Sequence, residues 1–466
     1  MELTALSITE AARLIEQRQL SPVELTRAHL ERIEQIDPAI NSFITVAAEA
    51  ALQQAQAAEV EIGRGQYRGP LHGIPIGLKD IFETQGLRTT AGSKFLADSI
   101  PSEDAAVVKR LKQQGAIILG KQNMHEWAMS VTTNNPHYGA CKNPWMPDCI
   151  PGGSSGGSGA ALAAQLCMGS LGSDTAGSIR IPAAFCGVVG LKPTYGRVSR
   201  RGVIPLSWSL DHVGPLARRV ADVALLLGAI TGYDPSDPYS IDAPEDDYLA
   251  QLEGGVKGWH IALARDGFLS EAKHDDPEVA QAVEQAVSIF EQLGARVSEI
   301  ALPEAREAQQ MALRIIVSDA ALFHRERMEE RPEDFGVDVL SALRRGASHT
   351  AVDYAQARRT QMMLRHHWGA LFNTYDLIMT PTTPTTAPPR EETPDSKAHR
   401  PSLVSYTAPF SLMGMPALSV PCGLSQAGLP IGLQLVAPVW TEARLLRAGY
   451  AYEQAAGWYI PTIRPM

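Results

Sequence analysis

Short apolar runs alternate with helical segments along most of the chain after residue 70, and this alternation limits the folds that the chain can adopt. HGIPIGLKD, EDAAVVKRLKQQG and AIILGKQN follow one another between residues 72 and 123. HIALARD, DDPEVAQAVEQAVSIFEQLG and ARVSEIAL repeat that order between residues 260 and 302. Strand, helix and strand at these lengths predict an α/β protein whose core is a largely parallel or mixed β-sheet flanked by helices.

The first 65 residues have the pattern of helices. SITE (7–10) and SPVE (21–24) both fit the capping box, and Pro22 stands at the favoured first helical position. The apolar residues that follow recur at roughly helical spacing: Leu25, Leu30, Ile33 and Ile36. We expect this stripe to pack against the core.

Charge and hydropathy limit the kinds of partner and the cellular location that we expect for this chain. The chain has 466 residues and a net charge of −10, from 41 Lys and Arg against 51 Asp and Glu, with no basic tract. Nucleic acid is therefore not expected as a direct partner. The sequence also lacks an 18-residue apolar run and a basic N-terminal leader followed by one. We expect no membrane association and a cytoplasmic location.

Cysteine usage and two proline-rich stretches complete the general description. The five cysteines form no CxxC pair, which argues against a disulfide framework and a structural zinc site. Residues 233–246 and 380–402 are Pro-rich and polar, so we expect surface connections there. The second follows the apolar run DLIMT and should start at a strand end, where it either lines a site or is a plain exposed loop.

The stretch GGSSGGSG (152–159) has the composition of a flexible linker, yet it runs straight into an apolar, alanine-rich segment. It is not a Walker loop, because no Lys follows its last glycine. It matches the G-x-S-x-G nucleophile elbow around Ser154, but NPWMPDCIP before it cannot be a central strand. The alternative is a tight loop whose backbone N–H groups reach a small polar group.

A second serine-bearing turn follows in GSDTAGSIR (172–180). The small residues 175–177 ahead of Ser178 could direct their N–H groups at one oxygen, which is what an oxyanion hole requires. A nucleophilic serine also needs a base. Lys79 ends the apolar run GIPIGLK, where burial would favour its neutral amine, although a lysine after a strand is more often exposed.

Together these blocks resemble the amidase signature family of serine hydrolases, from about residue 5 to the end of the chain. The strongest block is 151–198, PGGSSGGSGAALAAQLCMGSLGSDTAGSIRIPAAFCGVVGLKPTYGRV. Further matching blocks occur in the family order: LHGIPIGLKD, GKQNMHEWAM, SLDHVGPLAR, LIMTPTTPTTAP and MPALSVPCGL with GLPIGLQLV. The resemblance implies the amidase signature fold in one domain over 1–466. Its parts would be helices at about 1–65, the signature core at about 66–230, a variable substrate region at about 231–375 and a C-terminal core part at about 376–466.

The resemblance also implies roles for individual residues. Lys79 would be the base, Ser154 a bridging serine after a cis peptide bond, and Ser178 the nucleophile. The backbone amides of the oxyanion hole would come from Thr175, Ala176, Gly177 and Ser178. Substrate contacts are expected from Met129, Gly152 and Gly153. A small-molecule amide would be the substrate, with no metal or organic cofactor, and homo-oligomerisation stays open.

Neighbouring residues of the signature have simpler structural interpretations. Ser155 either joins the relay or fixes the loop backbone, and Asp174 is expected to hydrogen-bond the loop. Arg180 is expected to pair with a carboxylate inside the fold, and Cys186 to be buried. Many family members carry glycine where this chain has Ala176. Either the turn uses a negative φ there or the oxyanion hole is altered.

Two branches of the family offer two functions. The stand-alone hydrolases cleave amides, and the same chemistry also suits esters or carbamates. The other branch is the glutaminase subunit of a tRNA-dependent amidotransferase, which usually reads SIRQP after the nucleophile and carries an ASSNLARYDG-type segment. This chain reads SIRIP (178–182) and RIIVSDAALFHRERMEERPEDFG (314–336). We therefore expect a stand-alone amidase, and the alternative is the glutaminase of an amidotransferase complex.

Four apolar residues late in the variable region could line the substrate pocket but fit a core stripe better: Met362, Met363, Trp368 and Phe372.

Overall fold

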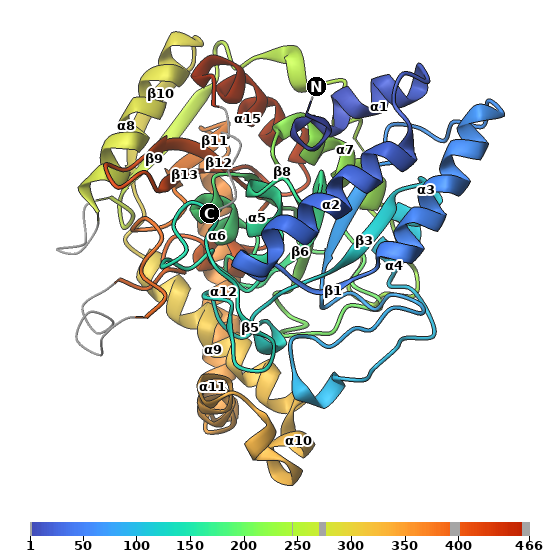
Figure 1. Ribbon diagram of the computed structural model, residues 1–466. Helices are drawn as coiled ribbons and strands as arrows, with labels where there is room; N and C mark the ends of the chain where they lie inside the picture. Colours follow the sequence, from blue (N-terminus) through green and yellow to red (C-terminus); the bar gives the residue numbers. More distant parts are fainter. Residues whose placement is uncertain (1, 245, 270–275, 392–400, 459–466) are drawn as a thin grey trace.

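The computed structural model describes residues 2–244, 246–269, 276–391 and 401–458 (Figure 1). Within these residues the main sheet has eleven strands. In their order across the sheet, the strands are β1 (Phe43–Val46), β3 (Ile117–Gln122), β2 (Pro75–Lys79), β6 (Gly169–Asp174), β8 (His212–Ala217), β7 (Val189–Lys192), β12 (Ala417–Leu424), β13 (Pro430–Val436), β11 (Leu377–Pro381), β9 (His260–Asp266) and β10 (Arg296–Ala301). Strands β4 (Asn134–Asn135) and β5 (Gly139–Ala140) form a separate small pair.

The sheet is mixed, as the sequence predicts. Strands β3, β2 and β6 are parallel to one another, and so are β11, β9 and β10. The strands between these two groups pair antiparallel. The predicted strand, helix and strand units are confirmed: β2, α4 (Ala106–Gln113) and β3 form one, and β9, α8 (Pro277–Gln292) and β10 form the other.

Helices cover the sheet and extend below it in Figure 1. The remaining α-helices of the described residues are α1 (Ile8–Glu16), α2 (Pro22–Ile40), α3 (Ala48–Gly63), α5 (Gly156–Ala163), α6 (Arg180–Cys186), α7 (Val220–Ile230), α9 (Ala305–Phe323), α10 (Arg325–Glu330), α11 (Val337–Ala347), α12 (Ala351–Leu371), α14 (Ala408–Met413) and α15 (Glu442–Ala456). Short 3₁₀ turns lie at η1 (Leu3–Ala5), η2 (Lys94–Leu96), η3 (Glu126–Ala128), η4 (Leu252–Gly254) and η5 (Pro332–Asp334).

The N-terminal helices begin where the capping signals place them. The Ser7 side chain accepts a hydrogen bond from the Glu10 N–H, and the Glu10 carboxylate accepts one from the Ser7 N–H, which completes the predicted capping box. Ser21 caps α2 by accepting from the N–H groups of Val23 and Glu24. Three of the four predicted stripe residues of α2 are buried, and Leu30 is half-buried.

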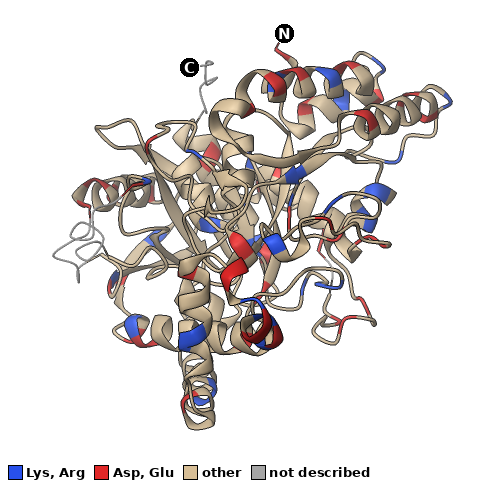
Figure 2. Cartoon of the chain, turned by 60° about the horizontal axis from the view of Figure 1, so that its bottom comes forward, with Lys and Arg blue, Asp and Glu red and all other residues tan. Residues whose placement is uncertain are grey.

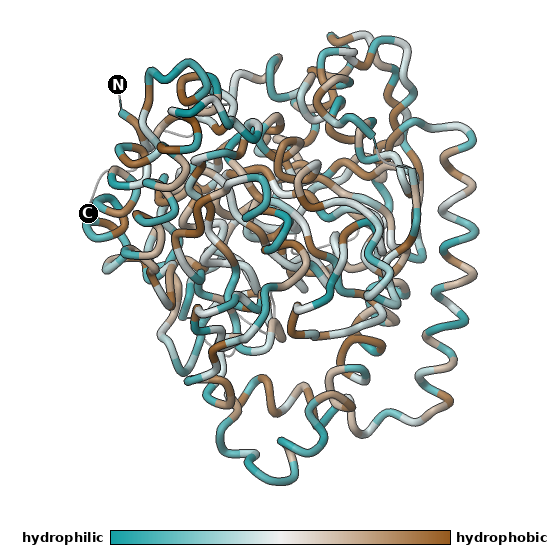
Figure 3. Tube along the Cα trace, turned by 90° about the vertical axis from the view of Figure 1, so that its right-hand side faces the viewer, coloured by the Kyte–Doolittle hydropathy of each residue, from teal (hydrophilic) through white to brown (hydrophobic). Residues whose placement is uncertain are grey.

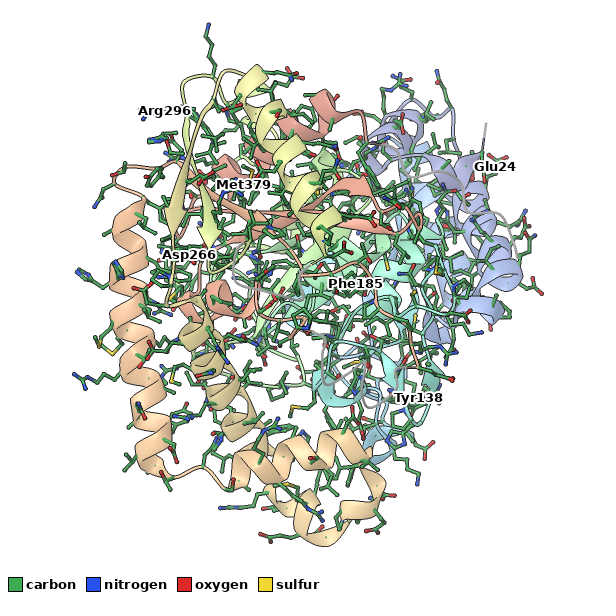
Figure 4. The ribbon with its side chains drawn as sticks, turned by 90° about the vertical axis from the view of Figure 1, so that its left-hand side faces the viewer. Glu24, Tyr138, Phe185, Asp266, Arg296 and Met379 are labelled. Carbon is green, nitrogen blue, oxygen red and sulfur yellow. The ribbon has the colours of Figure 1, made fainter. Side chains whose placement is uncertain are left out.

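The core lies between the sheet and its helices. Figure 4 shows Phe185 and Met379 inside the molecule and Glu24 and Arg296 at its edge, in agreement with their burial and exposure. One apolar cluster joins residues of α2, α3, α5 and α6 to β3, and a larger one spans most of the remaining sheet. Cys186 is buried, as expected.

Helix α12 departs from the sequence expectation. It stands along one edge of the molecule and carries hydrophilic residues over much of its length (Figure 3). Trp368 is fully buried, but Met362 and Met363 are 73% and 60% exposed. The predicted core stripe is therefore wrong for these two methionines, because the helix has only one covered face and both lie off it.

Acidic and basic residues are interspersed over the outer helices and loops (Figure 2). No helix in the described ranges is long and apolar enough to cross a membrane. The Pro-rich stretch after residue 380 does begin where β11 ends, and its residues 392–400 lie outside the described part of the chain.

Candidate active site

Parallel pairing brings the two sequence blocks of interest to the same edge of the sheet. Strand β2 ends at Lys79, and its neighbour β6 runs through Gly172 into GSDTAGSIR (Figure 1). The register pairs Leu78 with Leu171, so Lys79 comes to lie beside the end of β6. The carboxyl ends of parallel strands share one edge of a sheet, which explains why residues nearly a hundred positions apart meet.

Lys79 is fully buried at this edge. Its Nζ atom lies 2.7 Å from the Ser154 Oγ and 2.8 Å from the Ser173 Oγ. Burial lowers the pKa of Lys79 to about 7, and the negative charges of Asp211 and Asp174 oppose that shift. A neutral amine is therefore well populated near neutral pH, where an ordinary lysine would be protonated.

The glycine and serine run forms a tight loop that leads into α5. Gly152 has a φ of +81°, and the peptide bond between Gly153 and Ser154 is cis. A Cβ on Gly153 would lie 2.8 Å from the Thr133 Oγ1, and one on Gly157 would lie 2.4 Å from the Asn123 carbonyl oxygen. These glycines allow close backbone packing inside the core, so the run is not a linker.

The nucleophile elbow is not formed around Ser154. In an elbow the serine follows a strand directly, whereas the described residues between β5 and α5 contain no strand beyond an isolated bridge at Cys149. Ser154 is 0% exposed and Ser178 is 5% exposed, so Ser178 is the more accessible of the two hydroxyls.

Ser178 lies at the end of the turn between β6 and α6. The Ser155 N–H donates to the Ser178 carbonyl over 3.3 Å, which ties the two serine loops together. The hydroxyls of Ser154 and Ser178 form no hydrogen bond with each other in the described part of the chain. The structure thus joins Lys79 to Ser154 directly and places Ser178 on the adjoining loop.

A buried ion pair holds the turn before Ser178. The Arg180 guanidinium donates to both carboxylate oxygens of Asp174 over 2.9 Å, which confirms the predicted internal partner of Arg180. Its other donors reach Gln434, Ser411 and a backbone carbonyl. Although burial opposes ionisation, Arg180 holds the pKa of Asp174 well below its usual range. The pair is therefore structural and stays charged.

Asp174 also uses one of the amides expected in the oxyanion hole. The Gly177 N–H donates to the Asp174 Oδ1 over 2.7 Å. That N–H has only one proton to give, which argues against Gly177 as an oxyanion donor. Thr175, Ala176 and Ser178 stay as candidate donors. Ala176 is not one of the described residues with a positive φ, whereas Gly177 has a φ of +136°. The turn therefore accommodates alanine at position 176.

Two of the three predicted substrate contacts belong to the loop itself. Met129 is half-buried just after η3, and Gly152 and Gly153 are buried between the strip 131–133 and Pro182. The Ser155 Oγ donates to the Ser173 carbonyl over 3.2 Å, which favours its backbone-fixing role.

Sequence reasoning missed two polar residues of the site. Ser173 is the second hydroxyl on Lys79, and Asp211 accepts a hydrogen bond of 2.7 Å from the Thr175 Oγ1. Both stand inside the blocks GSDTAGSIR and SLDHVGPLAR that carry the resemblance. Ser173 is next to Asp174 in the sequence, and Asp211 comes just before β8. These two positions were the available signal. The described ranges contain no group of three or more His, Cys, Asp or Glu side chains arranged to hold a metal ion.

Comparison with known sequences identifies one family, and the two relatives described here carry the same name. The family model described as Amidase matches residues 24–446. The chain is 41% identical over 484 residues to a glutamyl-tRNA(Gln) amidotransferase subunit from Geobacter sp. (strain M21), and the match covers 99% of both chains. It is 43% identical to the protein of the same name from Trichlorobacter lovleyi, over 98% of this chain and 99% of that one.

Solved structures widen the range of similar proteins. A vestigial protein complex that reveals the origins of an s-triazine catabolic enzyme contains a chain with a TM-score of 0.91 and 36% identity, over 97% of this chain and 99% of that one. A peptide amidase in complex with the competitive inhibitor chymostatin has a TM-score of 0.86 and 31% identity, over 98% of both chains. The fold is thus shared with a peptide amidase, and the sequence is similar to those of amidotransferase subunits.

Proposed function

This chain belongs to the amidase family, and from that premise we propose that it hydrolyses amide bonds through an acyl-enzyme on Ser178. Lys79 would act as the base and Ser154 as the proton relay. The observation that carries the proposal is the buried Lys79 amine, 2.7 Å from the Ser154 hydroxyl. A neutral lysine in contact with a hydroxyl is a base that works near pH 7 without a histidine.

Acylation moves one proton along the serines. The neutral Lys79 amine takes the Ser154 proton while the Ser154 oxygen takes the Ser178 proton. The Ser178 Oγ then attacks the carbonyl carbon of the amide, and N–H groups of Thr175, Ala176 and Ser178 stabilise the oxyanion. When the C–N bond breaks, the Lys79 ammonium returns its proton through Ser154 to the leaving amine.

Deacylation reuses the same groups. Water gives up a proton to the relay, its oxygen attacks the ester carbon, and the bond to the Ser178 Oγ breaks. The carboxylic acid leaves and the Ser178 hydroxyl regains its proton. The relay requires the Ser178 hydroxyl to turn toward Ser154 in the substrate complex, and catalytic hydrogen bonds commonly tighten at that stage. Esters and carbamates would react by the same steps.

A second candidate function is the glutaminase step of an amidotransferase. The names of the similar sequences favour it over a stand-alone enzyme, since the relatives described above are amidotransferase subunits that match over nearly their whole length. The similarity to a solved complex also favours work with another protein chain. Against it stand SIRIP at 178–182 and the segment 314–336, both unlike that branch. The chemistry at Ser178 is the same in both candidates.

The test measures which amides the purified chain hydrolyses and whether it needs partner proteins to do so. A stand-alone amidase releases amine or ammonia from aryl and primary amides without any other protein. A glutaminase of an amidotransferase complex releases ammonia from L-glutamine, and only once its partner proteins are present. In either case Lys79→Met should lose at least about 100-fold in rate, because it removes the base and keeps the volume. If Lys79→Met retains full activity, the proposed mechanism is wrong.

A further inference from the structure

Asp211 links the oxyanion turn to the rest of the protein. Its Oδ1 accepts the Thr175 hydroxyl over 2.7 Å, and its Oδ2 accepts the N–H groups of Leu206 and Ser207 over 2.9 and 3.0 Å. The carboxylate is only 7% exposed. Three hydrogen bonds to one buried carboxylate fix the Thr175 side chain relative to residues 206 and 207.

The segment that Asp211 binds is itself anchored to two helices. The Ser207 Oγ donates to the Asp319 Oδ2 on α9 over 2.6 Å, and the Tyr354 hydroxyl on α12 donates to the Asp319 Oδ1 over 3.0 Å. Asp319 and Tyr354 also line a cavity of about 550 Å³. The oxyanion turn is therefore held from outside the signature blocks.

The turn that Asp211 holds also carries a contact of the catalytic amine: Asp211 accepts from Thr175, and Ser173, two residues earlier, has its Oγ 2.8 Å from the Lys79 Nζ. Among the charged groups that act on Lys79, Asp211 does most to raise its pKa against the effect of burial, followed by Asp174. Asp174 is neutralised by Arg180, with Lys192 and His212 nearby. Asp80, the residue after Lys79, is paired with Lys121. Burial raises the pKa of Asp211, while the charge of Arg200 and the three hydrogen bonds to the carboxylate oppose that rise. Within the described residues no ion pair joins Asp211 and Arg200, and the Arg200 guanidinium donates to the Asp211 backbone carbonyl.

We propose that Asp211 is a positioning residue of the amidase reaction with two tasks. It holds Thr175 in place for the oxyanion, and its negative charge stabilises the Lys79 ammonium that forms when the relay takes the serine proton. The inference rests on the proposed function, because it assigns Asp211 to the Lys79 and Ser178 site. The second task resembles that of a buried carboxylate which stabilises a protonated base without taking the proton itself.

Two variants separate the two tasks. Asp211→Asn keeps the shape and most hydrogen bonds but removes the charge. Thr175→Val removes the hydroxyl and keeps the charge. The readout is the rate at which a fluorophosphonate labels Ser178 between pH 5 and 9, which requires no knowledge of the natural substrate. Thr175→Ser, which retains the hydroxyl, should restore the rate that Thr175→Val loses.

The two variants should change different features of the pH profile of labelling. Asp211→Asn should move the acid limb of the labelling rate to lower pH by about 1 unit, because Lys79 gives up its proton more easily. It should also lower the plateau. Thr175→Val should lower the plateau by roughly 10- to 100-fold and leave the midpoint unchanged, because only the alignment of the turn suffers.

A control carboxylate and the Lys79 variant make the outcome decisive. Asp222 on α7 is 1% exposed and accepts the Thr9 N–H over 3.1 Å, so Asp222→Asn tests the loss of a buried carboxylate elsewhere. It should leave both midpoint and plateau unchanged. If Asp211→Asn behaves like Asp222→Asn while Lys79→Met abolishes labelling, the proposed role of Asp211 is wrong and the mechanism stands. If Lys79→Met still labels at the full rate, the mechanism itself fails.

Discussion

The Nζ atom of Lys79 lies 2.7 Å from the Oγ atom of Ser154, and both side chains are fully buried. A lysine so placed has lost the water that normally stabilises its charge, and its pKa falls to about 7. The Ser154 oxygen accepts a hydrogen bond from the amine in place of solvent.

Activity should rise with pH through the pKa of Lys79. The base must be neutral, so protonation below about pH 7 removes it, and each further pH unit downward lowers the rate about tenfold. The measurement is the initial rate of hydrolysis of an anilide between pH 5 and 9, with stability checked over the same range. A flat profile would argue against a neutral lysine in the rate-determining step.

The two neighbouring serines should differ in importance. Ser154→Ala removes the hydroxyl that is proposed to relay the proton between Lys79 and Ser178 and should cost about 100-fold or more in kcat. Ser155→Ala removes a hydrogen bond to the Ser173 carbonyl and should cost less than about tenfold. Steady-state kinetics of both variants against wild type make the comparison. Equal losses would mean that the relay does not pass through Ser154.

The oxyanion turn should tolerate one small change and reject another. Ala176→Gly should stay within about threefold of wild-type kcat, because Ala176 does not need a positive φ and the turn already fits its methyl group. Gly177→Ala should abolish activity, since a Cβ there would lie 2.3 Å from the Thr407 Oγ1 on a backbone with φ +136°. An active Gly177→Ala enzyme would show that the turn has a different conformation in solution.

The ion pair behind the turn should matter for stability. Asp174→Asn leaves the buried Arg180 charge without its carboxylate and should reduce the free energy of unfolding by about 3–5 kcal/mol. The surface pair of Arg331 and Asp334 is the control, and Asp334→Ala should leave the midpoint of urea unfolding almost unchanged. Urea titrations at pH 7 compare the two. Similar small losses would mean that the buried pair is dispensable.

The sequence predicts the parts of this site that depend on local pattern. Strand β2 and the turn before Ser178 follow from apolar runs and small residues, and the capping box at Ser7 follows from spacing. The family resemblance supplies the roles. Both kinds of information concern residues close together in the chain or blocks already known to belong together.

The rest depends on contacts between distant residues, which leave little local pattern. Asp211 reaches Thr175 across the pairing of β6 with β8, and its place in the block SLDHVGPLAR does not tell which residue it contacts. The Gly177 N–H is directed by a carboxylate whose orientation depends on Arg180 and therefore on Gln434 and Ser411. Met362 has an apolar side chain, yet which face of α12 is covered depends on helix packing.

The most direct test of the mechanism is to label the protein with a fluorophosphonate and locate the adduct by intact mass and peptide mapping. The account predicts one adduct, on Ser178, formed in wild type and absent in Lys79→Met. An adduct on Ser154 would contradict it, because Ser154 would then be the nucleophile and not the relay.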